Sequence, residues 1–470
     1  MAGKDMEKAL AIAEKVAREG GRSFFVGGFV RDRIRGEENK DIDMEVHRIS
    51  FEKLQEILES EGRCIVIGAG FGIFSLKGFR LDVAMPRTEK TTGRGHRDFA
   101  VDVDPFIGEE RAAARRDFTM NALMQDVLTG EILDFTGGIS DIRNRIIRHV
   151  DPRSFGEDPL RALRGCQFAA RFGYSIAEET VALCREMDLS ALPGERVFEE
   201  LKKALLQADC PSVFFEELRR MDGLAVWFAE LEKMIGVPQD PVFHPEGDVW
   251  NHTMRTVDEA AKLRSMAREP LYFMLAALCH DMGKPAATQE INGRFHAYGH
   301  DEGGVATAER FLRKITAEKR LIAYVCDAVR LHMRPNMLVQ QKASDKAYRR
   351  LFDQSCVPED LLLLAKADYL ASLAEGSYRE TERKLREQLE GYRRLMERPY
   401  VQAKDLLEAG VQPGPDIREG LAYLHKLRLA DVDREEALTQ TLGHIRARHR
   451  SDGSEKNRNA DREEKKTGDR

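Results

Sequence analysis

The sequence predicts an α+β protein, with a mixed β-sheet and its helices over residues 1–150 and an all-helical remainder. Two observations favour this fold class. Up to Val150, short apolar runs of strand type, bounded by glycines, alternate with helical patterns. From Glu157 onward the apolar residues recur with the spacing of amphipathic helices. At 470 residues the chain exceeds what one core usually organises, so we expect roughly two to four compact units.

Composition and charge narrow the class of protein. Hydrophobic residues make up 42% and charged residues 33% of the chain, which is typical of a globular protein. The formal charge of −6 argues against indiscriminate nucleic-acid binding, although a local basic face is sufficient for RNA phosphates. The seven cysteines form no Cys-x-x-Cys pair, and neither a signal peptide nor a membrane-spanning apolar run is visible. We therefore expect a cytoplasmic protein without membrane contact, whose oligomeric state the sequence does not reveal.

The first candidate site lies in residues 24–49. An apolar run of strand type, Phe24–Val26, is followed after a basic segment by the alternating run 41–46. Because successive side chains of a strand point to opposite faces, Asp41, Asp43 and Glu45 should share one face. Carboxylates two residues apart on one face can hold a pair of divalent ions, as in-line transfer of a nucleotidyl group requires. The alternative is a surface strand with a solvated acidic face.

The turn between these two runs supports the first interpretation. Gly27 and Gly28 leave room for a phosphate chain to approach the backbone, with Arg31 and Lys40 available for its charge. The whole pattern, Gly-Gly-x-Val-Arg-Asp and then Lys-Asp-x-Asp, resembles the signature of the nucleotidyltransferase head shared by tRNA CCA-adding enzymes and bacterial poly(A) polymerases. The resemblance implies a DNA polymerase β-like head in which two aspartates, here Asp41 and Asp43, hold the catalytic Mg²⁺ ions.

The other elements of residues 1–150 follow in order. We expect an amphipathic helix over about residues 6–20 and another after Ser50, which stands where an N-cap belongs. Strands are expected at 64–67, 73–76, 81–85 and 131–135. Asp82 lies on the third of these, either as a solvated acid on an edge strand or as a third carboxylate beside the metals. Both alternatives stay open.

Two further segments of the head bear on function. The polar segment between Pro86 and Glu110 has the length of a functional or disordered loop, and the family resemblance associates such a loop with addition of the final A. Residues 115–123, RRDFTMNAL, resemble the family's next motif, and the guanidinium groups of Arg115 and Arg116 suit the phosphates of a triphosphate or of RNA. The alternative is a basic helix start.

The helical part opens with a candidate base-reading motif. Asp158 precedes Pro159, which suits a first helical turn, and Arg161 and Arg164 follow at helical spacing, so Asp158 and Arg161 should share a helix face. Cytosine and adenine both offer an amino donor beside a ring-nitrogen acceptor, so an Asp that accepts and an Arg that donates can read both. This segment resembles the Glu-Asp-x-x-Arg protein template of class II CCA-adding enzymes. A helical ion pair with a solvated row of arginines is the alternative.

The second half contains a candidate metal centre. The string His-Asp-Met-Gly-Lys at 280–284 follows an apolar helix at 271–278, and it resembles the HD phosphohydrolase superfamily. Imidazole and carboxylate together suit a divalent transition metal or Mg²⁺ more than a structural zinc. The candidate ligands are His252, His280, Asp281 and Asp368, with His300 and His332 as further candidates. The resemblance implies a phosphatase or 2′,3′-cyclic phosphodiesterase, and a metal-free scaffold is the alternative.

Together these patterns predict five segments and one principal function. The segments are a nucleotidyltransferase head (1–150), a base-selecting and RNA-binding neck (151–235), an HD domain (236–400), C-terminal helices (401–449) and a disordered charged tail (450–470). The predicted function is template-independent addition of CCA to the tRNA 3′ end from CTP and ATP. The alternatives are a poly(A) polymerase, a CC-only or A-only enzyme, an HD phosphohydrolase whose head only binds nucleotide or RNA, and a non-catalytic RNA-binding module.

Overall fold

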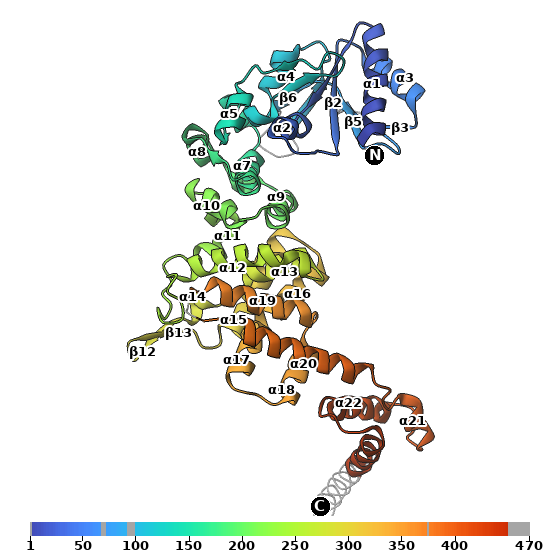
Figure 1. Cartoon of the computed structure of the whole chain (residues 1–470), viewed down its shortest axis with the longest axis vertical. Coiled ribbons are helices and arrows are strands. Elements are labelled where there is room, and N and C mark those ends of the chain that lie inside the picture. The colour runs from blue at the N-terminus through green and yellow to red at the C-terminus, as the bar shows by residue number, and fades with distance from the viewer. Residues whose placement is uncertain (1, 67–71, 92–98, 374–375, 450–470) are drawn as a thin grey trace, which may run out of the picture.

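The computed structural model describes residues 2–66, 72–91, 99–373 and 376–449. The molecule is elongated, with the sheet-containing head at one end and helices extending to the other (Figure 1). In this described part, no helix is both long and apolar enough to cross a membrane. The predicted tail, 450–470, lies outside the described residues.

A seven-stranded mixed sheet forms the centre of the head, as predicted. β2 pairs antiparallel with β1 but parallel with β5, so the sheet is mixed where the candidate carboxylates lie. In spatial order the strands are β3 (Cys64–Val66), β4 (Ile73–Leu76), β5 (Leu81–Ala84), β2 (Ile42–His47), β1 (Arg22–Val26), β8 (Met124–Asp126) and β9 (Ile132–Leu133). The apolar face of β2, formed by Ile42, Met44 and Val46, is buried in the core, which confirms the alternation.

Helices cover the sheet, and one local expectation needs correction. The helices of the head are α1 (Ala2–Arg18), α2 (Gly28–Arg35), α3 (Phe51–Glu61), α4 (Glu109–Ala114) and α5 (Gly138–Asn144). The basic segment after the glycine turn is thus a helix, α2. The segment after Pro86 is not without structure, because β6 (Arg87–Thr91) pairs antiparallel with β7 (Phe99–Val103). Backbone pairing of these two short strands explains the difference; residues 92–98 between them lie outside the described residues.

A short parallel pair, β10 (Ile146–Ile147) with β11 (Ser175–Ile176), joins the head to the neck. The neck helices are α6 (Pro152–Gly156), α7 (Leu160–Phe172), α8 (Glu178–Arg185), α9 (Gly194–Gln207), α10 (Ser212–Arg220) and α11 (Leu224–Glu232). Asp158 lies just before α7, where its Oδ1 accepts a hydrogen bond from the backbone N–H of Leu160 at 3.1 Å. The expectation that Asp158 shares a helix face with Arg161 is therefore wrong, because Asp158 acts on the helix start instead.

The remainder is helical, with one hairpin. Its elements are α12 (Val249–Leu263), α13 (Pro270–Cys279), α14 (Lys284–Ala287), β12 (Gln289–Ile291), β13 (Arg294–His296), α15 (His300–Ile315), α16 (Lys319–Leu331), α17 (Arg334–Gln340), α18 (Asp345–Gln354), α19 (Pro358–Ala371), α20 (Arg379–Glu397), α21 (Ala403–Glu408) and α22 (Pro415–Leu429). One hydrophobic core runs from α1 through the neck to α19, whereas the residues of α21 and α22 form a cluster of their own. The predicted boundary at residue 401 stays a prediction, because residues of α18 and α20, inside the preceding segment, form another separate cluster.

Candidate active sites

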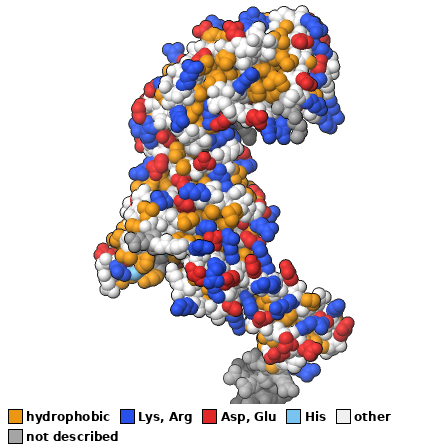
Figure 2. Space-filling model, viewed as in Figure 1, with side chains coloured by type: hydrophobic (Ala, Val, Ile, Leu, Met, Phe, Trp, Pro, Cys, Tyr) orange, Lys and Arg blue, Asp and Glu red, His pale blue; other side chains and the backbone are white. Residues whose placement is uncertain are grey.

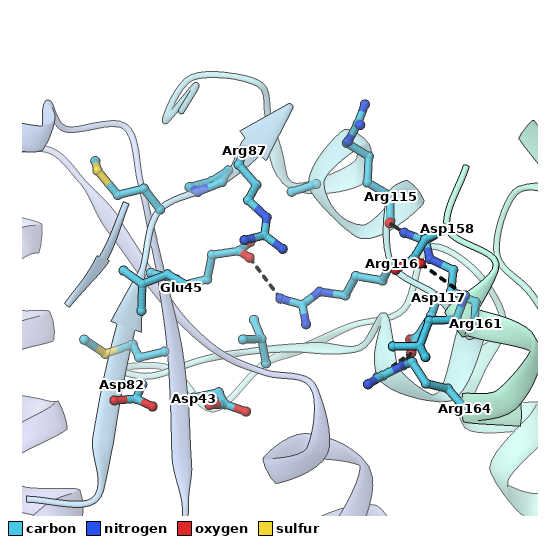
Figure 3. A pocket seen from close by; sticks show the side chains of 18 of the residues that line it. Asp43, Glu45, Asp82, Arg87, Arg115, Arg116, Asp117, Asp158, Arg161 and Arg164 are labelled. Carbon is cyan, nitrogen blue, oxygen red and sulfur yellow. Dashed lines mark hydrogen bonds and ion pairs between the residues drawn. The ribbon is translucent and has the colours of Figure 1, made fainter. Parts of the chain in front are cut away.

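The candidate residues of the head and neck meet at one cavity of about 540 Å³. Figure 3 shows two carboxylates, Asp43 and Asp82, at one end of it, and Arg161 and Arg164 of the neck at the other. The charged residues that line it are Asp43, Glu45, Asp82, Arg87, Arg115, Arg116, Asp117, Asp158, Arg161, Arg164 and Arg196. The cavity thus combines two features that a nucleotide site needs, carboxylates for cations and cations for phosphates.

Strand pairing places the carboxylates. In the parallel pairing of β2 with β5, Asp43 stands directly opposite Asp82. Burial raises the pKa of Asp43, and the charges of Asp82 and Asp41 raise it further, against the lowering effect of Arg116. The negative charges of these carboxylates repel one another, and either a proton or a divalent cation would relieve that repulsion. Because all the donor atoms are oxygens, the group suits Mg²⁺. The register therefore favours Asp82 as a third carboxylate; Asp41 is exposed just before β2.

An ion pair fixes Arg116 across the cavity. Arg116 Nη2 donates to Glu45 Oε2 at 2.9 Å, and Glu45 Oε1 lies 3.0 Å from His47 Nε2. Burial would raise the pKa of Glu45, but the charge of Arg116 and the contact with His47 lower it overall. Gly27 has φ 64°, and a Cβ there would lie 3.3 Å from Arg116 Nη1. A glycine at 27 therefore allows the turn to approach the charged groups closely.

The predicted phosphate ligand Arg31 occupies a different place. Its side chain is buried, its Nε donates to Asp32 Oδ1 and its Nη1 donates to Asn121 Oδ1, both at 2.8 Å. The guanidinium also lies 4.6 Å from the ring centre of Phe172. These contacts join α2 to the neck, and Arg31 is not among the residues that line the cavity. Gly28 begins α2 beside it, and the nucleotide-binding role of both residues stays a prediction.

The neck motif reaches the cavity, with each member held by a separate partner. Asp158 Oδ2 lies 3.2 Å from Arg196 Nη2. Arg161 donates to the backbone oxygens of Ser154 and Arg115 at 2.7 and 3.0 Å. Arg196 comes from α9, and nothing in its local sequence indicates a role at this site.

Arg164 serves the head–neck junction. Its Nε and Nη2 both donate to Asp117 Oδ2, at 2.9 and 2.6 Å. Burial would raise the pKa of Asp117, but Arg164 and Asn121 lower it overall. Asp117, which is buried, and Arg164, which is partly exposed, thus form an ion pair between the RRDFT segment and α7.

In the second half, the predicted ligands come together from five helices or their ends. The six residues are His252 (α12), His280 and Asp281 (after α13), His300 (α15), His332 (after α16) and Asp368 (α19). Asp281 lies between two groups of them. Its Oδ2 lies 3.1 Å from His280 Nε2, and its Oδ1 lies 3.2 and 3.7 Å from the Nε2 atoms of His300 and His332.

The orientation of the histidines fits a cation. In His280, His300 and His332, Nδ1 lies 2.7 to 2.8 Å from the carbonyl oxygen three residues earlier, which only an N–H can bond. In the neutral form of each ring the lone pair is therefore on Nε2, the nitrogen that faces the cluster, and His280 Nε2 has no hydrogen-bond partner among the described residues. Burial lowers the pKa of His332 to about 4, so this ring is neutral at pH 7. Neutral imidazoles with carboxylates are the donors that divalent transition metals prefer.

Two residues that the sequence did not single out support this cluster. Glu246 Oε1 lies 2.7 Å from His252 Nδ1, whose ring also contacts Asp368 Oδ1 at 2.9 Å. Although burial lowers it, the bonds to Asp368 and Glu246 raise the pKa of His252 to about 9. Lys284 Nζ lies 2.7 Å from Asp281 Oδ2. The spacing of Lys284 in the His-Asp string could have indicated it, whereas Glu246 lies in a turn-rich stretch without a signal.

Three family models match successive parts of the chain. The family model described as poly A polymerase head domain matches residues 23–148, and the HD domain model matches residues 249–373. Between them, the model described as probable RNA and SrmB-binding site of polymerase A matches residues 173–235.

Relatives and solved structures extend this match to most of the chain. A multifunctional CCA protein of Actinobacillus pleuropneumoniae is 38% identical over 299 residues, which cover 62% of this chain and 70% of the relative. One of Alkalilimnicola ehrlichii is 34% identical over 395 residues, 81% of this chain and 92% of the relative. The crystal structure of the Bacillus stearothermophilus CCA-adding enzyme in complex with CTP shares the fold, with a TM-score of 0.66 at 22% identity over 95% of this chain and 99% of that one. The Thermotoga maritima CCA-adding enzyme complexed with tRNA has a TM-score of 0.61 at 20% identity, covering 93% and 94%. By its identity to these relatives and its coverage of their length, the chain belongs to the family of multifunctional CCA proteins.

Proposed function

We propose that this protein adds C, C and A to the 3′ end of tRNA from CTP and ATP without a nucleic-acid template. The observation that carries the proposal is the single cavity in which the carboxylates of Asp43 and Asp82 face the motif of Asp158 and Arg161. The candidate residues for cations and those for the base thus line the same cavity, of about 540 Å³. The names of the relatives support the same reaction.

The reaction is an in-line displacement. The 3′-hydroxyl oxygen of the RNA bonds to the α-phosphorus of the nucleotide, the bond to the β-phosphate bridge breaks, pyrophosphate leaves and the hydroxyl proton is lost. Two Mg²⁺ ions, when bound, activate the hydroxyl and neutralise the leaving group. We assign Asp43 and Asp82, with Asp41, to holding them. Arg116, held by Glu45, contributes its charge to the phosphates.

Selection of the base follows from complementarity. A carboxylate oxygen of Asp158 accepts from the exocyclic amino group, and the guanidinium of Arg161 donates to the adjacent ring nitrogen. Cytosine and adenine satisfy both bonds, whereas uracil and guanine place a carbonyl and an N–H at these positions. Discrimination is large because the mismatched buried groups remain unpaired. Arg196, the partner of Asp158, orients that carboxylate.

The test is product length on one substrate. A tRNA lacking its 3′ end is incubated with Mg²⁺ and with CTP and ATP, singly and together. Growth by three nucleotides followed by arrest, only with both nucleotides, supports the proposal. Growth by two C residues, a lone A or an unbounded A tail would each identify one of the narrower alternatives.

We propose a second activity for the HD domain, metal-dependent hydrolysis of phosphoesters at RNA ends or on nucleotides. A metal held there would supply an activated water for hydrolysis, in which the water oxygen bonds to phosphorus, an ester P–O bond breaks and the leaving oxygen takes a proton. The residues that would hold the metal are His252, His280, Asp281, His300, His332 and Asp368. A metal-dependent release of phosphate, or opening of a 2′,3′-cyclic phosphate, that His280→Ala abolishes would support this; no release with any divalent metal would contradict it.

The shape of the molecule suits a large RNA. Figure 2 shows a concave side between the head and the lower helical body, with lysine and arginine side chains on both sides of it. We propose that the acceptor end of tRNA enters the cavity from this side. The seven cysteines are free, which is typical of a reducing compartment such as the cytoplasm.

A further inference from the structure

A second cavity, of about 530 Å³, opens beside the HD cluster and has no assigned role. Lys284 and His300 line it, and both also contact Asp281. The cavity therefore adjoins the proposed phosphate-reacting centre directly. Its size is that of a small-molecule site.

The outer wall of this cavity is aromatic and exposed. Tyr298 is 76% exposed and Phe243 is 61% exposed, although both line the cavity. The Tyr298 ring stacks on that of His296, with centroids 5.1 Å apart and planes inclined by only 8°. Large aromatic side chains exposed together on a surface usually mark a binding site. Figure 2 shows hydrophobic side chains gathered in this region.

The stacked rings of His296 and Tyr298 lie at the end of a β-hairpin. β12 and β13 form the hairpin that projects from the helical body in Figure 1, and His296 is the last residue of β13. Asn292 and Gly293 at its turn have φ of 53° and 75°, as a tight two-residue hairpin requires. Met333, just before α17, and Met337, within it, also line the cavity. Methionine adapts its shape and contacts aromatic rings favourably.

A ligand that fits these features carries a flat ring at one end and a phosphate at the other. The ring would lie against Tyr298 and Phe243, and the phosphate would lie towards Lys284 and the cluster. Sugar-linked nucleobases have this arrangement, and their bases stack on aromatic side chains whatever their identity. A phosphoester without a ring would leave the aromatic wall unused.

We propose that this cavity is a nucleobase subsite of the HD domain, in which Tyr298 supports the base of a nucleotide whose phosphate reaches the cluster. The inference rests on the proposed phosphohydrolase function and deepens it. The base belongs either to a free nucleotide or to the 3′-terminal residue of an RNA. Because stacking reads the face and not the edge of a base, the subsite selects for the presence of a base more than for its identity.

The test compares substrates with and without a base in the full-length, metal-loaded protein. Wild type and Tyr298→Ala are each assayed with three substrates: adenosine 2′,3′-cyclic phosphate, ribose 2′,3′-cyclic phosphate and a short RNA that ends in a cyclic phosphate. Loss of one stacking partner raises KM about tenfold. We expect that rise for adenosine cyclic phosphate or for the RNA, little change in kcat and no change for the ribose compound. Tyr298→Phe should behave as wild type.

A binding measurement separates this inference from the function on which it rests. Saturation-transfer NMR with adenosine needs no hydrolysis and no metal; the signal of the base protons should fall in Tyr298→Ala and persist in Tyr298→Phe. Phe106→Ala is the matched control, because Phe106 is 67% exposed on the head. If the wild type hydrolyses nothing but Tyr298→Ala loses the adenosine signal, the subsite stands and the activity fails. If KM and the adenosine signal are both unaffected, the subsite is refuted. A rise in KM confined to the mononucleotide or to the RNA identifies which one supplies the base.

Discussion

Replacing Glu45 by glutamine should weaken the reaction with both nucleotides equally. Glu45 contacts no base position; it holds Arg116, whose guanidinium we assign to the phosphates that CTP and ATP share. A hydrogen bond to a charged group contributes about 1.5–3 kcal/mol. Because the Arg116 side chain is 24% exposed and partly screened by water, we expect the lower part of that range, a loss of roughly ten- to thirtyfold in kcat/KM.

The assay is incorporation of a single nucleotide into two substrates. CTP is tested with tRNA that lacks the whole CCA end, and ATP is tested separately with tRNA that already ends in CC. Glu56→Gln is the matched control, because the Glu56 side chain is 69% exposed on α3 of the same head. Circular dichroism and a thermal transition near that of wild type would show that Glu45→Gln is folded. A kcat/KM within twofold of wild type, or a loss for one nucleotide only, would refute the assignment of Glu45 and Arg116.

Three further predictions follow from the two sites. Asp82→Ala should reduce incorporation about a hundredfold or more, as Asp43→Ala should, because the two residues stand opposite each other in the β2–β5 register and we assign both carboxylates to the same pair of Mg²⁺ ions; an Asp82→Ala enzyme with more than about a tenth of wild-type kcat would restore the edge-strand alternative. Gly27→Ala should destabilise the protein by about 1–3 kcal/mol in urea unfolding, because the residue keeps φ 64° beside Arg116; an unchanged midpoint would count against this. The pKa of His252, raised to about 9, means that metal must displace a proton, so calorimetry should show apparent affinity rising with pH up to about 9. A metal affinity that does not change with pH would contradict the assignment. In the metal-free protein, the raised pKa of His252 also stabilises the folded state. This contribution to the free energy of unfolding is fully present below pH 6.5 and is lost as pH rises through about 9.

Local sequence patterns were sufficient where function and structure share a short stretch. The alternation around Asp43 gave the strand face correctly, because the period of a strand is visible in six residues. The string around His280 predicted a helix end, and α13 ends at Cys279. All six candidate ligands of the HD centre come together in the fold, although they extend from His252 to Asp368, and the string at 280–284 indicated where the cluster would be centred.

The parts that could not be predicted depend on pairing between distant elements. The role of Asp82 depends on β5 pairing in register with β2. The sequence of a strand does not show which other strand it will pair with. Arg196 reaches Asp158 only because α9 packs beside α7, and Glu246 reaches His252 from a turn. Arg31 shows the reverse case, since its charge indicated phosphate binding but packing against Phe172 directs it into the interior.

The most direct test asks whether nucleotide addition depends on the head and cyclic-phosphate opening on the HD domain, with the same labelled tRNA in both assays. Asp43→Ala and His280→Ala proteins are each given tRNA lacking its 3′ end with CTP, ATP and Mg²⁺, and the same tRNA ending in a cyclic phosphate with a transition metal. We predict that Asp43→Ala loses growth by three nucleotides but still opens the cyclic phosphate, and that His280→Ala does the opposite. Full nucleotide addition by Asp43→Ala would contradict the central claim that the carboxylates of the head carry CCA addition.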